Sequence, residues 1–480
     1  MPACDGTEFL QRIRNLKAEI WIDGQRITDN ICDHGAFKGV LKSKAKLFDL
    51  QLEKNKKDFM TYTSPLTGQR VGTSFMEPKT KEDLEKRRLT TQEWAKTSGG
   101  MMGRSPDYMN TGLMALGAAS DVFEDQHHRG NNMKRLYENA REKDLTLSHT
   151  FVNPQVNRST GYYEANEEPI SARIVETNAD GLVIKGARLL ATQGGITDEL
   201  LVLPIGGKYI EESFIYGFSI PSNTPNLKFI CRESFAYRPS QFDHPLGSRF
   251  EEMDTIVVFD HVVVPWERVF LYNNYTIANS MYEQTHFYPF LLHQTVARQT
   301  IKTEFLLGVA QMIVETIDIS GYLHVKEKVS ELITGYETMK ALLLSSEMGA
   351  KTNSRGTMVP DPNPLYAAIT SFPRLYPRFT EILQLLGASG LISIPTEQDF
   401  QSTGIEKDLQ HYLQGATCDA KSRTQLFRLA WDISTSAFGG RQTLYERFFF
   451  GDPVRLNTSL YNGYSKQNAV ELAKSLLSQD

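Results

Sequence analysis

The sequence predicts an α+β protein with three parts: an N-terminal helical domain, a middle β-barrel and a C-terminal four-helix bundle. Its 480 residues are enough for two to four domains at about 100–200 residues each. Runs of β-branched and aromatic residues are concentrated between residues 146 and 270. Apolar residues at helical spacing dominate from residue 271 onward. We therefore expect domains at 1–145, 146–270 and 271–480.

The first part, residues 1–145, is predicted to be mostly helical. Charges alternate in sign through KTKEDLEKRR at 79–88, a pattern typical of a solvated helix face. GLMALGAASDVFED at 112–125 is rich in small residues and apolar on one side, which predicts a packed helix.

Strands are predicted in the middle part. Two β-rich runs in SARIVETNADGLVIKGARLLAT at 171–192 flank Asp180 and Gly181, a hairpin signal. SFIYGFSIP at 213–221 and DTIVVFDHVVVP at 254–265 add further runs of the same kind. A small barrel or curled sheet accommodates these strands.

The last part carries stripes of apolar residues at three- and four-residue spacing, which we interpret as the core of a helical bundle. The stripes are Phe305, Leu306, Val309, Met312 and Ile313; Leu375, Phe379, Ile382, Leu383 and Leu386; and Leu426, Leu429, Ala430, Ile433 and Ala437. TNSRGTMVPDPNP at 352–364, with its glycine and prolines, is predicted to be a loop between two helices.

Charge and cysteine content exclude several classes of protein. The 52 basic and 57 acidic residues leave a net charge of −5, without the basic excess of a nucleic-acid-binding protein. The four scattered cysteines have no zinc or ferredoxin spacing and favour a reduced, cytoplasmic protein. The N-terminus shows no signal peptide, and the longest apolar stretch, near 305–314, is too short to span a bilayer. We expect no nucleic-acid partner and no membrane association.

Several common catalytic motifs are absent from the sequence. It contains no GxGxxG after a strand, no GxxxxGK[ST], no HExxH and no GxSxG. His127 and His128 lie in the polar segment QHHRG and indicate a solvated turn, so we expect no metal site. If the protein carries out redox chemistry, its cofactor is held in another way and its electrons come from elsewhere.

The segment SGGMMGRSPDYMN at 98–110 is the first candidate functional site. Ser105-Pro106-Asp107 is a helix-start signal that follows a glycine-rich stretch. Arg104 and Tyr108 are then about one helical turn apart on the same face. A guanidinium and a phenol that point together can bind an anionic or phenolic oxygen. The alternative is a helix cap with a surface Arg–Asp pair.

Two further segments are polar or glycine-rich. LSHTFVNPQVNRS at 147–159 combines His149 with amides and an arginine, which suits a flavin ring or its pyrophosphate; the alternative is a polar loop. In STSAFGGRQTLYERFFFGDP at 434–453, Gly439 and Gly440 indicate a helix C-cap, or backbone that approaches a phosphate beside Arg441.

Six segments in this order resemble the 4-hydroxyphenylacetate 3-monooxygenase family, the oxygenase components of two-component flavin-dependent aromatic hydroxylases. Together they favour the functional interpretation of the candidate segments over the local alternatives. They are MGRSPDY (102–108), SHTFVNPQVNR (148–158), ARLLATQGG (187–195), GSRFEEMDTIVVFDHVVVPWERVFLY (247–272), LYPRFTEILQLLGASGLI (375–392) and SAFGGRQTLYERFF (436–449).

The resemblance implies an acyl-CoA-dehydrogenase-like fold and a homotetramer or dimer assembled through the C-terminal bundle. It also implies that a separate NAD(P)H:flavin oxidoreductase supplies FADH2, which binds between the β domain and the bundle. Reaction with O2 then gives a C4a-hydroperoxyflavin, whose terminal oxygen is transferred to the carbon ortho to a phenol. The default reaction is 4-hydroxyphenylacetate to 3,4-dihydroxyphenylacetate.

The same resemblance implies roles for the matching residues. Arg104 favours the phenolate, Tyr108 hydrogen-bonds it, and His149 accepts or relays the phenolic proton and donates to the hydroperoxide. Flavin contacts are implied for His149, Thr150, Phe151, Gln155, Val156, Asn157, Arg158, Thr192, Ser436, Phe438, Gly439, Gly440 and Arg441. Substrate contacts are implied for Ile205 and Gly206, in a segment at 202–213 whose two glycines suggest a mobile lid.

Other classes of function remain open beside this one. A 4-hydroxybutyryl-CoA dehydratase would need cluster cysteines that are missing, since no CxxxC occurs and Thr300 stands where a cysteine would follow His293. An acyl-CoA dehydrogenase would use a carboxylate base and retain its flavin, whereas a helical scaffold would have no flavin affinity. The phenol itself is open as well, with phenol, a coumarate, a tyrosine-like phenol or a chlorophenol as alternatives. The choice of FAD rather than FMN rests on the resemblance, and whether the reductase docks or only releases flavin by diffusion stays open.

Overall fold

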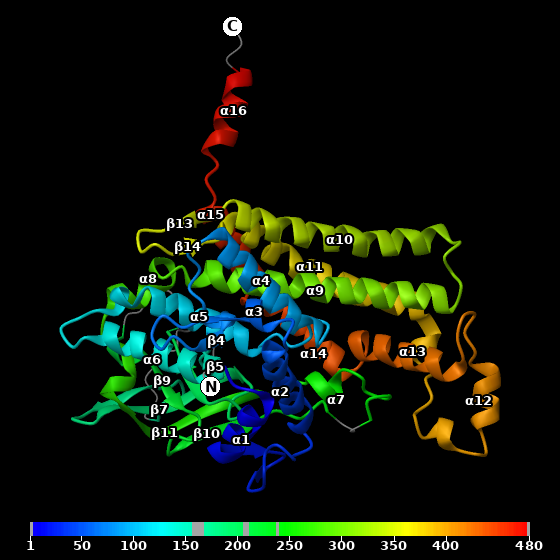
Figure 1. Cartoon of the computed structure of the whole chain (residues 1–480), viewed down its shortest axis with the longest axis horizontal. Coiled ribbons are helices and arrows are strands. Elements are labelled where there is room, and N and C mark those ends of the chain that lie inside the picture. The colour runs from blue at the N-terminus through cyan, green and yellow to red at the C-terminus, as the bar shows by residue number, and fades with distance from the viewer. Residues whose placement is uncertain (1–2, 156–167, 205–210, 237–239, 478–480) are drawn as a thin grey trace.

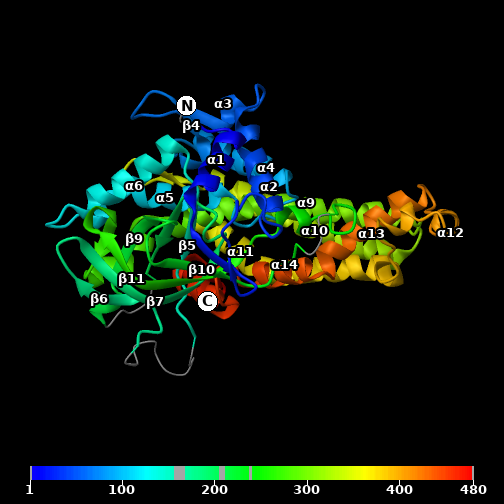
Figure 2. The ribbon, with the colours of Figure 1, turned by 90° about the horizontal axis from the view of Figure 1, so that it is seen from below.

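The computed structural model describes residues 3–155, 168–204, 211–236 and 240–477. The chain forms N-terminal helices, two β-sheets and a set of long C-terminal helices, and the N-terminal helices lie against both of the other parts (Figure 1). Seen from below, the long helices extend well beyond the sheets (Figure 2). This arrangement confirms the helical, β, helical order and the acyl-CoA-dehydrogenase-like fold class. Among the described residues, no helix is both long and apolar enough to cross a membrane.

The N-terminal part is mainly helical, with one feature that the sequence analysis missed. A tight turn at Asp23 and Gly24, both with positive φ, connects β1 (Glu19–Ile22) to β2 (Gln25–Arg26). β1 pairs in parallel with β10, so this hairpin belongs to the sheet. The remaining elements are α1 (Gly6–Leu16), α2 (Lys38–Leu52), α3 (Lys57–Met60), β3 (Thr61–Thr63), β4 (Arg70–Gly72), α4 (Lys81–Lys96), α5 (Pro106–Ala118) and α6 (Arg129–Lys143).

The structure confirms one expectation about these helices in part and corrects another. The first half of the small-residue segment at 112–125 is the end of α5, which is buried almost throughout, as predicted, and the second half contains the short 3-10 helix Ser120–Phe123. The solvated face expected at 79–88 is only partly correct, because Arg87 is buried. Its guanidinium donates to the carbonyls of Thr73, Ser74 and Met76 and to Thr111 Oγ1, so four acceptors satisfy the charge.

The β domain consists of two sheets rather than one closed barrel. Their strand orders are β2-β1-β10-β11-β7-β6 and β12-β9-β8-β5. They meet where Ser148 Oγ donates to the Thr192 carbonyl at 2.8 Å and Thr150 Oγ1 donates to that of Leu189 at 2.9 Å. The strands are β5 (Leu147–Thr150), β6 (Arg173–Thr177), β7 (Gly181–Thr192), β8 (Glu199–Val202), β9 (Tyr216–Pro221), β10 (Leu227–Cys231), β11 (Asp254–Pro265) and β12 (Val269–Tyr272). The hairpin predicted at Asp180-Gly181 joins β6 to β7.

The C-terminal part is a bundle, as predicted, and most of the apolar stripes form its core. Met312 is the exception: it is 51% exposed, because the stripe of Leu306, Val309 and Ile313 faces the core and Met312 lies to one side of it. The main helices are α8 (Tyr275–Gln284), α9 (Phe287–Thr316), α10 (Leu323–Met348), α11 (Pro362–Gly387), α13 (Ala420–Ser434) and α14 (Ala437–Phe448).

Smaller elements complete the chain. The loop predicted at 352–364 contains a two-stranded hairpin and the first residues of α11. These elements are η1 (Thr73–Phe75), η2 (Ser120–Phe123), η3 (Glu212–Phe214), α7 (Gly247–Phe250), η4 (Trp266–Arg268), β13 (Lys351–Thr352), β14 (Met358–Val359), η5 (Ala388–Leu391), η6 (Asp399–Gln401), α12 (Glu406–Tyr412), α15 (Pro453–Gly463) and α16 (Gln467–Leu477).

Candidate active site

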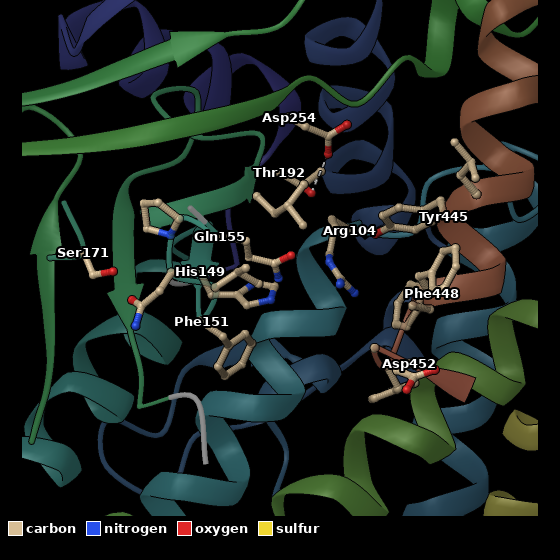
Figure 3. Close-up of a pocket in the computed structure, with 18 of the residues that line it drawn as sticks. Arg104, His149, Phe151, Gln155, Ser171, Thr192, Asp254, Tyr445, Phe448 and Asp452 are labelled. Carbon is tan, nitrogen blue, oxygen red and sulfur yellow. Dashed lines mark hydrogen bonds between the residues drawn. The ribbon is translucent and has the colours of Figure 1, made fainter. Parts of the chain in front are cut away.

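A cavity of about 1680 Å³ lies between the β domain, α5 and the C-terminal helices. Ligand pockets are usually about 300–1,000 Å³, so this one has room for a small substrate together with a larger group. Most of its exposed surface is apolar. Figure 3 shows Arg104 between Tyr445 on one side of the cavity and His149 and Gln155 on the other.

Arg104 is a cation held among aromatic rings. The carbon atom at the centre of its guanidinium lies 4.1 Å from the ring centroids of both Tyr108 and Phe449, and 5.3 Å from that of Tyr445. Its Nε and Nη1 are buried and have no hydrogen-bond partner among the described residues. A buried guanidinium with free donors is unfavourable unless a ligand completes it. The arrangement therefore points to an anionic or polar ligand.

The loop that carries Arg104 is fixed from the β domain. The backbone N–H groups of Gly103 and Arg104 donate to the buried carboxylate of Glu252, at 2.9 and 2.8 Å. Gln193 Nε2 donates both to Glu252 and to the Arg104 carbonyl. The surface Arg–Asp pair that was the alternative is wrong, because Asp107 is buried and accepts from Ser105 Oγ instead.

Tyr108 and His149 lie beside Arg104, as the sequence predicted. Their ring centroids are 5.7 Å apart, and His149 also packs against Phe151 at 4.9 Å. Burial, with the Arg104 charge as a second cause, lowers the pKa of His149 well below its ordinary value. Burial raises the pKa of Tyr108, and Arg104 opposes that shift. At neutral pH the imidazole is therefore uncharged and the Tyr108 phenol protonated.

The residues after β5 follow the cavity wall. Phe151 and Gln155 line the cavity, as does Asn153, whose Oδ1 is buried without a partner among the described residues. Thr150 is not in the lining, because its hydroxyl is used to join the two sheets. Several predicted contact residues lie outside the described residues: Val156, Asn157, Arg158, Ile205 and Gly206.

Thr192 and Arg441 meet at one carboxylate in the cavity wall. Thr192 Oγ1 donates to Asp254 Oδ1 at 2.8 Å (Figure 3). Arg441 donates twice to Asp254, and Arg232 donates once. Arg441 Nη1 has no partner among the described residues. The cluster thus combines a satisfied ion pair with a donor that remains available to a ligand.

The glycine pair near residue 440 begins a helix rather than ending one, so the C-cap interpretation is wrong. Ser436 is the N-cap of α14, and its Oγ accepts from the N–H of Gly439. The cavity lining of the single chain contains none of four predicted flavin contacts, Ser436, Phe438, Gly439 and Gly440. Their contact with flavin stays a prediction.

The sequence analysis missed the cavity face of α14. Its members recur at helical spacing with Arg441, a pattern that predicts one face of a helix but not that this face meets a cavity. The missed members are Ala437, Leu444, Tyr445 and Phe448, and Phe449 follows at the helix end. Asp254, whose carboxylate accepts two hydrogen bonds from Arg441, was also missed.

The lining fits a flavin better than a metal ion. Four residues at the cavity have a buried donor or acceptor that finds no partner in the part of the chain that the structure describes: Arg104, Asn153, Arg441 and Tyr445. A flavin offers matching groups on its ring and phosphates. Within the described part of the chain, no cluster of three or more metal-ligating side chains occurs.

Comparison with known proteins gives consistent matches over the whole chain. Residues 5–271 match the family model described as 4-hydroxyphenylacetate 3-hydroxylase N terminal, and residues 278–478 match the corresponding C-terminal model. A relative from Bacillus subtilis, named a probable 4-hydroxyphenylacetate 3-monooxygenase, is 49% identical over 481 residues, which cover 100% of this chain and 99% of the relative.

Two solved structures are similar in fold and sequence. The oxygenase component of 4-hydroxyphenylacetate 3-monooxygenase in complex with FAD has a TM-score of 0.95 at 42% identity, covering 99% of this chain and 98% of that one. The same component in complex with FAD and 4-hydroxyphenylacetate has a TM-score of 0.94 at 41% identity, with the same coverage.

Proposed function

The chain belongs to the 4-hydroxyphenylacetate 3-hydroxylase family, and from this premise we propose that it uses reduced FAD and O2 to convert 4-hydroxyphenylacetate to 3,4-dihydroxyphenylacetate. Arg104 is the observation that carries the proposal. It is a cation in a largely apolar cavity, with two buried donors that have no partner among the described residues. A phenolate oxygen is a ligand that satisfies both its charge and its donors.

Arg104 promotes ionisation of the substrate. A free phenol has a pKa of about 10, and a cation within hydrogen-bonding distance lowers that value. The phenolate makes the carbon ortho to its oxygen electron-rich, and that carbon receives the oxygen atom. One such charge-assisted contact contributes about 2–4 kcal/mol to the transition state when its donor is preorganised.

His149 takes the phenolic proton in this proposal. Its lowered pKa keeps the imidazole neutral, so one ring nitrogen is free to accept. Tyr108 stays protonated, and its hydroxyl remains a donor toward the phenolate. The two rings lie side by side, which supports their action on one substrate oxygen.

The flavin, when bound, supplies the reaction with O2 and the oxygen atom that is transferred. Gln155, Thr192 and Arg441 are the described polar residues proposed to hold it. Phe151, Phe448 and other aromatic side chains line the same cavity. Such apolar walls keep water away from the reacting atoms and so limit loss of the oxygen as peroxide.

A partner is needed to regenerate reduced flavin, because a nicotinamide-binding motif is absent from the sequence. We therefore include an NAD(P)H:flavin oxidoreductase in the proposal. Assembly into a homotetramer or dimer through the C-terminal bundle is also proposed. All four cysteines are free thiols, which supports a cytoplasmic location.

The test is product analysis with a flavin reductase, NADH, FAD and isotopically labelled O2. We expect 3,4-dihydroxyphenylacetate that carries one labelled oxygen. Flavin oxidation that yields only hydrogen peroxide would contradict 4-hydroxyphenylacetate as the substrate and leave other phenols to be tried. Reduction of bound FAD by an acyl-CoA thioester would instead support the dehydrogenase alternative, which the named relatives do not favour.

A further inference from the structure

A fully buried charge cluster lies between α9 and α14, beside the loop that leads to Arg104. Arg298 and Lys302 project from α9, and Glu446 projects from α14; their side chains are at most 1% exposed. Glu446 Oε1 accepts from Arg298 Nη1 at 2.7 Å and from Lys302 Nζ at 2.8 Å. Two cations therefore share one carboxylate in the core. Burial of three charged groups has a large desolvation cost, so a contribution of the cluster to stability alone does not explain it.

The same side chains hold the backbone of the loop that leads to Arg104. Arg298 Nη1 donates to the Gly100 carbonyl at 2.9 Å. Gln442 Nε2, from α14, donates to the Met101 carbonyl at 2.9 Å, while its Oε1 accepts from Lys302. Two consecutive carbonyls, three and four residues before Arg104, are thus fixed by two different helices.

The loop lies directly against these helices. A Cβ atom on Gly100, which has a φ of +71°, would be 2.7 Å from the Cβ of Lys302. A Cβ atom on Gly103 would be 2.2 Å from the ring of Tyr445, the neighbour of Glu446 in α14. The carbon at the centre of the Arg298 guanidinium is also 5.1 Å from the centroid of Phe449, the ring that contacts Arg104. Any shift of the cluster therefore reaches Arg104 through both the backbone and the rings.

From these contacts we propose that Arg298, Gln442 and Glu446 are positioning residues for Arg104, which set the place of its guanidinium in the cavity. Glu252 fixes the loop from the β domain at the N–H groups of Gly103 and Arg104. The α9–α14 cluster fixes the same loop from the bundle at its carbonyls. The inference rests on the proposed function, since it assigns these residues to the phenolate-stabilising role of Arg104.

The test uses 4-nitrophenol, whose phenolate absorbs visible light, bound to the flavin-free protein. The apparent pKa of the bound probe is measured from its absorbance at several pH values. A cation close to the phenol oxygen lowers this pKa, so the pKa shows whether Arg104 is in place. Arg298→Lys keeps the positive charge beside Glu446 but loses the fork that also reaches Gly100. Gln442→Leu removes the bond to Met101 and adds no charge. Both variants should raise the pKa of the bound probe and weaken its binding, in the direction of Arg104→Met but by less.

The reference variant Arg104→Met should raise the pKa of the bound probe by about 1–3 pH units, the usual effect of losing an adjacent opposite charge. Glu347→Gln is the matched control. The Glu347 carboxylate, near the end of α10, accepts from Arg88 Nε and lies 2.9 Å from His293 Nε2 of α9, and no hydrogen bond joins it to this loop among the described residues. We expect the control to leave the probe unchanged. Thermal denaturation of each variant identifies any loss of fold.

Each outcome separates the two proposals. If Arg104→Met shifts the probe while folded Arg298→Lys and Gln442→Leu behave like wild type, the cluster is structural only and the positioning role is overturned. A shift of equal size in Glu347→Gln would overturn it too, because the effect would then be general. If Arg104→Met leaves the probe unchanged, it is the proposed role of Arg104 that fails.

Discussion

Arg441 and Asp254 form a bidentate ion pair in the wall of the cavity, with Nε and Nη2 of the arginine each 2.7 Å from a carboxylate oxygen. Arg441 belongs to α14 and Asp254 begins β11, so the pair joins the bundle to the larger sheet. Burial by itself would raise the pKa of Asp254, but Arg441 and the other partners hold it well below its ordinary value. The carboxylate is therefore ionised throughout the physiological range.

Asp254→Asn should destabilise the protein strongly, because Arg441 would remain buried without a counter-charge. Removing one partner of a buried pair typically costs about 3–5 kcal/mol. Urea denaturation at neutral pH measures the free energy of unfolding. A depressed carboxyl pKa contributes stability above the unfolded value, about 3.9, and that stability is lost as the pH falls below it. The difference between the two proteins should therefore shrink in acid.

Asp121→Asn is the matched control for this prediction. Asp121 also forms a bidentate pair with an arginine, Arg355, at 2.7 Å for both oxygens. That pair lies at the surface, where the aspartate side chain is 64% exposed. Exposed pairs contribute about 0–1 kcal/mol, so the control should differ little from wild type. Equal losses in the two variants would contradict the importance of burial.

Gly103→Ala should disturb the active site without changing any charge. The added methyl group would lie 2.2 Å from the Tyr445 ring, which must then move away from Arg104. Overpacking of this kind typically costs about 1–3 kcal/mol. We expect less 3,4-dihydroxyphenylacetate and more hydrogen peroxide per flavin oxidised.

Gly308→Ala controls for a general effect of adding a methyl group. An added Cβ there meets nothing within 4 Å, and Gly308 lies inside α9. Alanine is a better helix former than glycine by about 1 kcal/mol, so this variant should be as stable as wild type or more so. Unchanged product ratios in Gly103→Ala would show that the position of Tyr445 does not matter.

His149 should make the protein less stable in mild acid. Its folded pKa lies well below the unfolded value of about 6.5, so below that pH the unfolded chain binds a proton that the folded chain does not. The free energy of unfolding should therefore fall with pH below about 6.5, by up to about 1.4 kcal/mol per pH unit. His149→Asn should flatten this dependence, as measured by urea denaturation at several pH values. His128→Asn, which replaces an exposed histidine, should retain the wild-type slope.

The order of the three parts and the trio of Arg104, Tyr108 and His149 could be predicted from the sequence. The order depends on a local signal, the hydrophobic periodicity of the helices. The trio depends on the resemblance of six segments to a known family, because the local pattern indicates only that Arg104 and Tyr108 share a helix face. The residues of α14 that line the cavity could not be predicted from the sequence, because Tyr445 and Phe448 have the spacing of any buried helix face. Only the fold shows which face meets the cavity.

Contacts between residues far apart in the chain were the other feature that the sequence did not predict. Glu252 and Arg298 both fix the loop at Gly100–Arg104 from positions about 150 and 200 residues away in the chain. The β1–β2 hairpin joins a sheet made otherwise from residues after 146. Hydrophobic periodicity does not predict such partners, because they depend on how the three parts pack together.

Arg104→Lys separates the charge of Arg104 from its shape. Lysine keeps a positive charge, but its compact ammonium cannot stack as a plane between Tyr108 and Phe449, each 4.1 Å from the guanidinium, or present two donors in a fork. We expect substrate to bind about tenfold more weakly than to wild type, because loss of one hydrogen bond to a charged group in the bound ground state costs about 1.5 kcal/mol. The oxygen transfer should suffer more, since the phenolate would be held in several orientations. Titration of substrate binding, together with the ratio of 3,4-dihydroxyphenylacetate to hydrogen peroxide, measures the two effects separately. Arg104→Met, which removes the charge, should lose both substrate binding and product. If Arg104→Lys instead couples oxygen transfer as well as wild type, charge alone is sufficient and the aromatic rings around the guanidinium have no catalytic role.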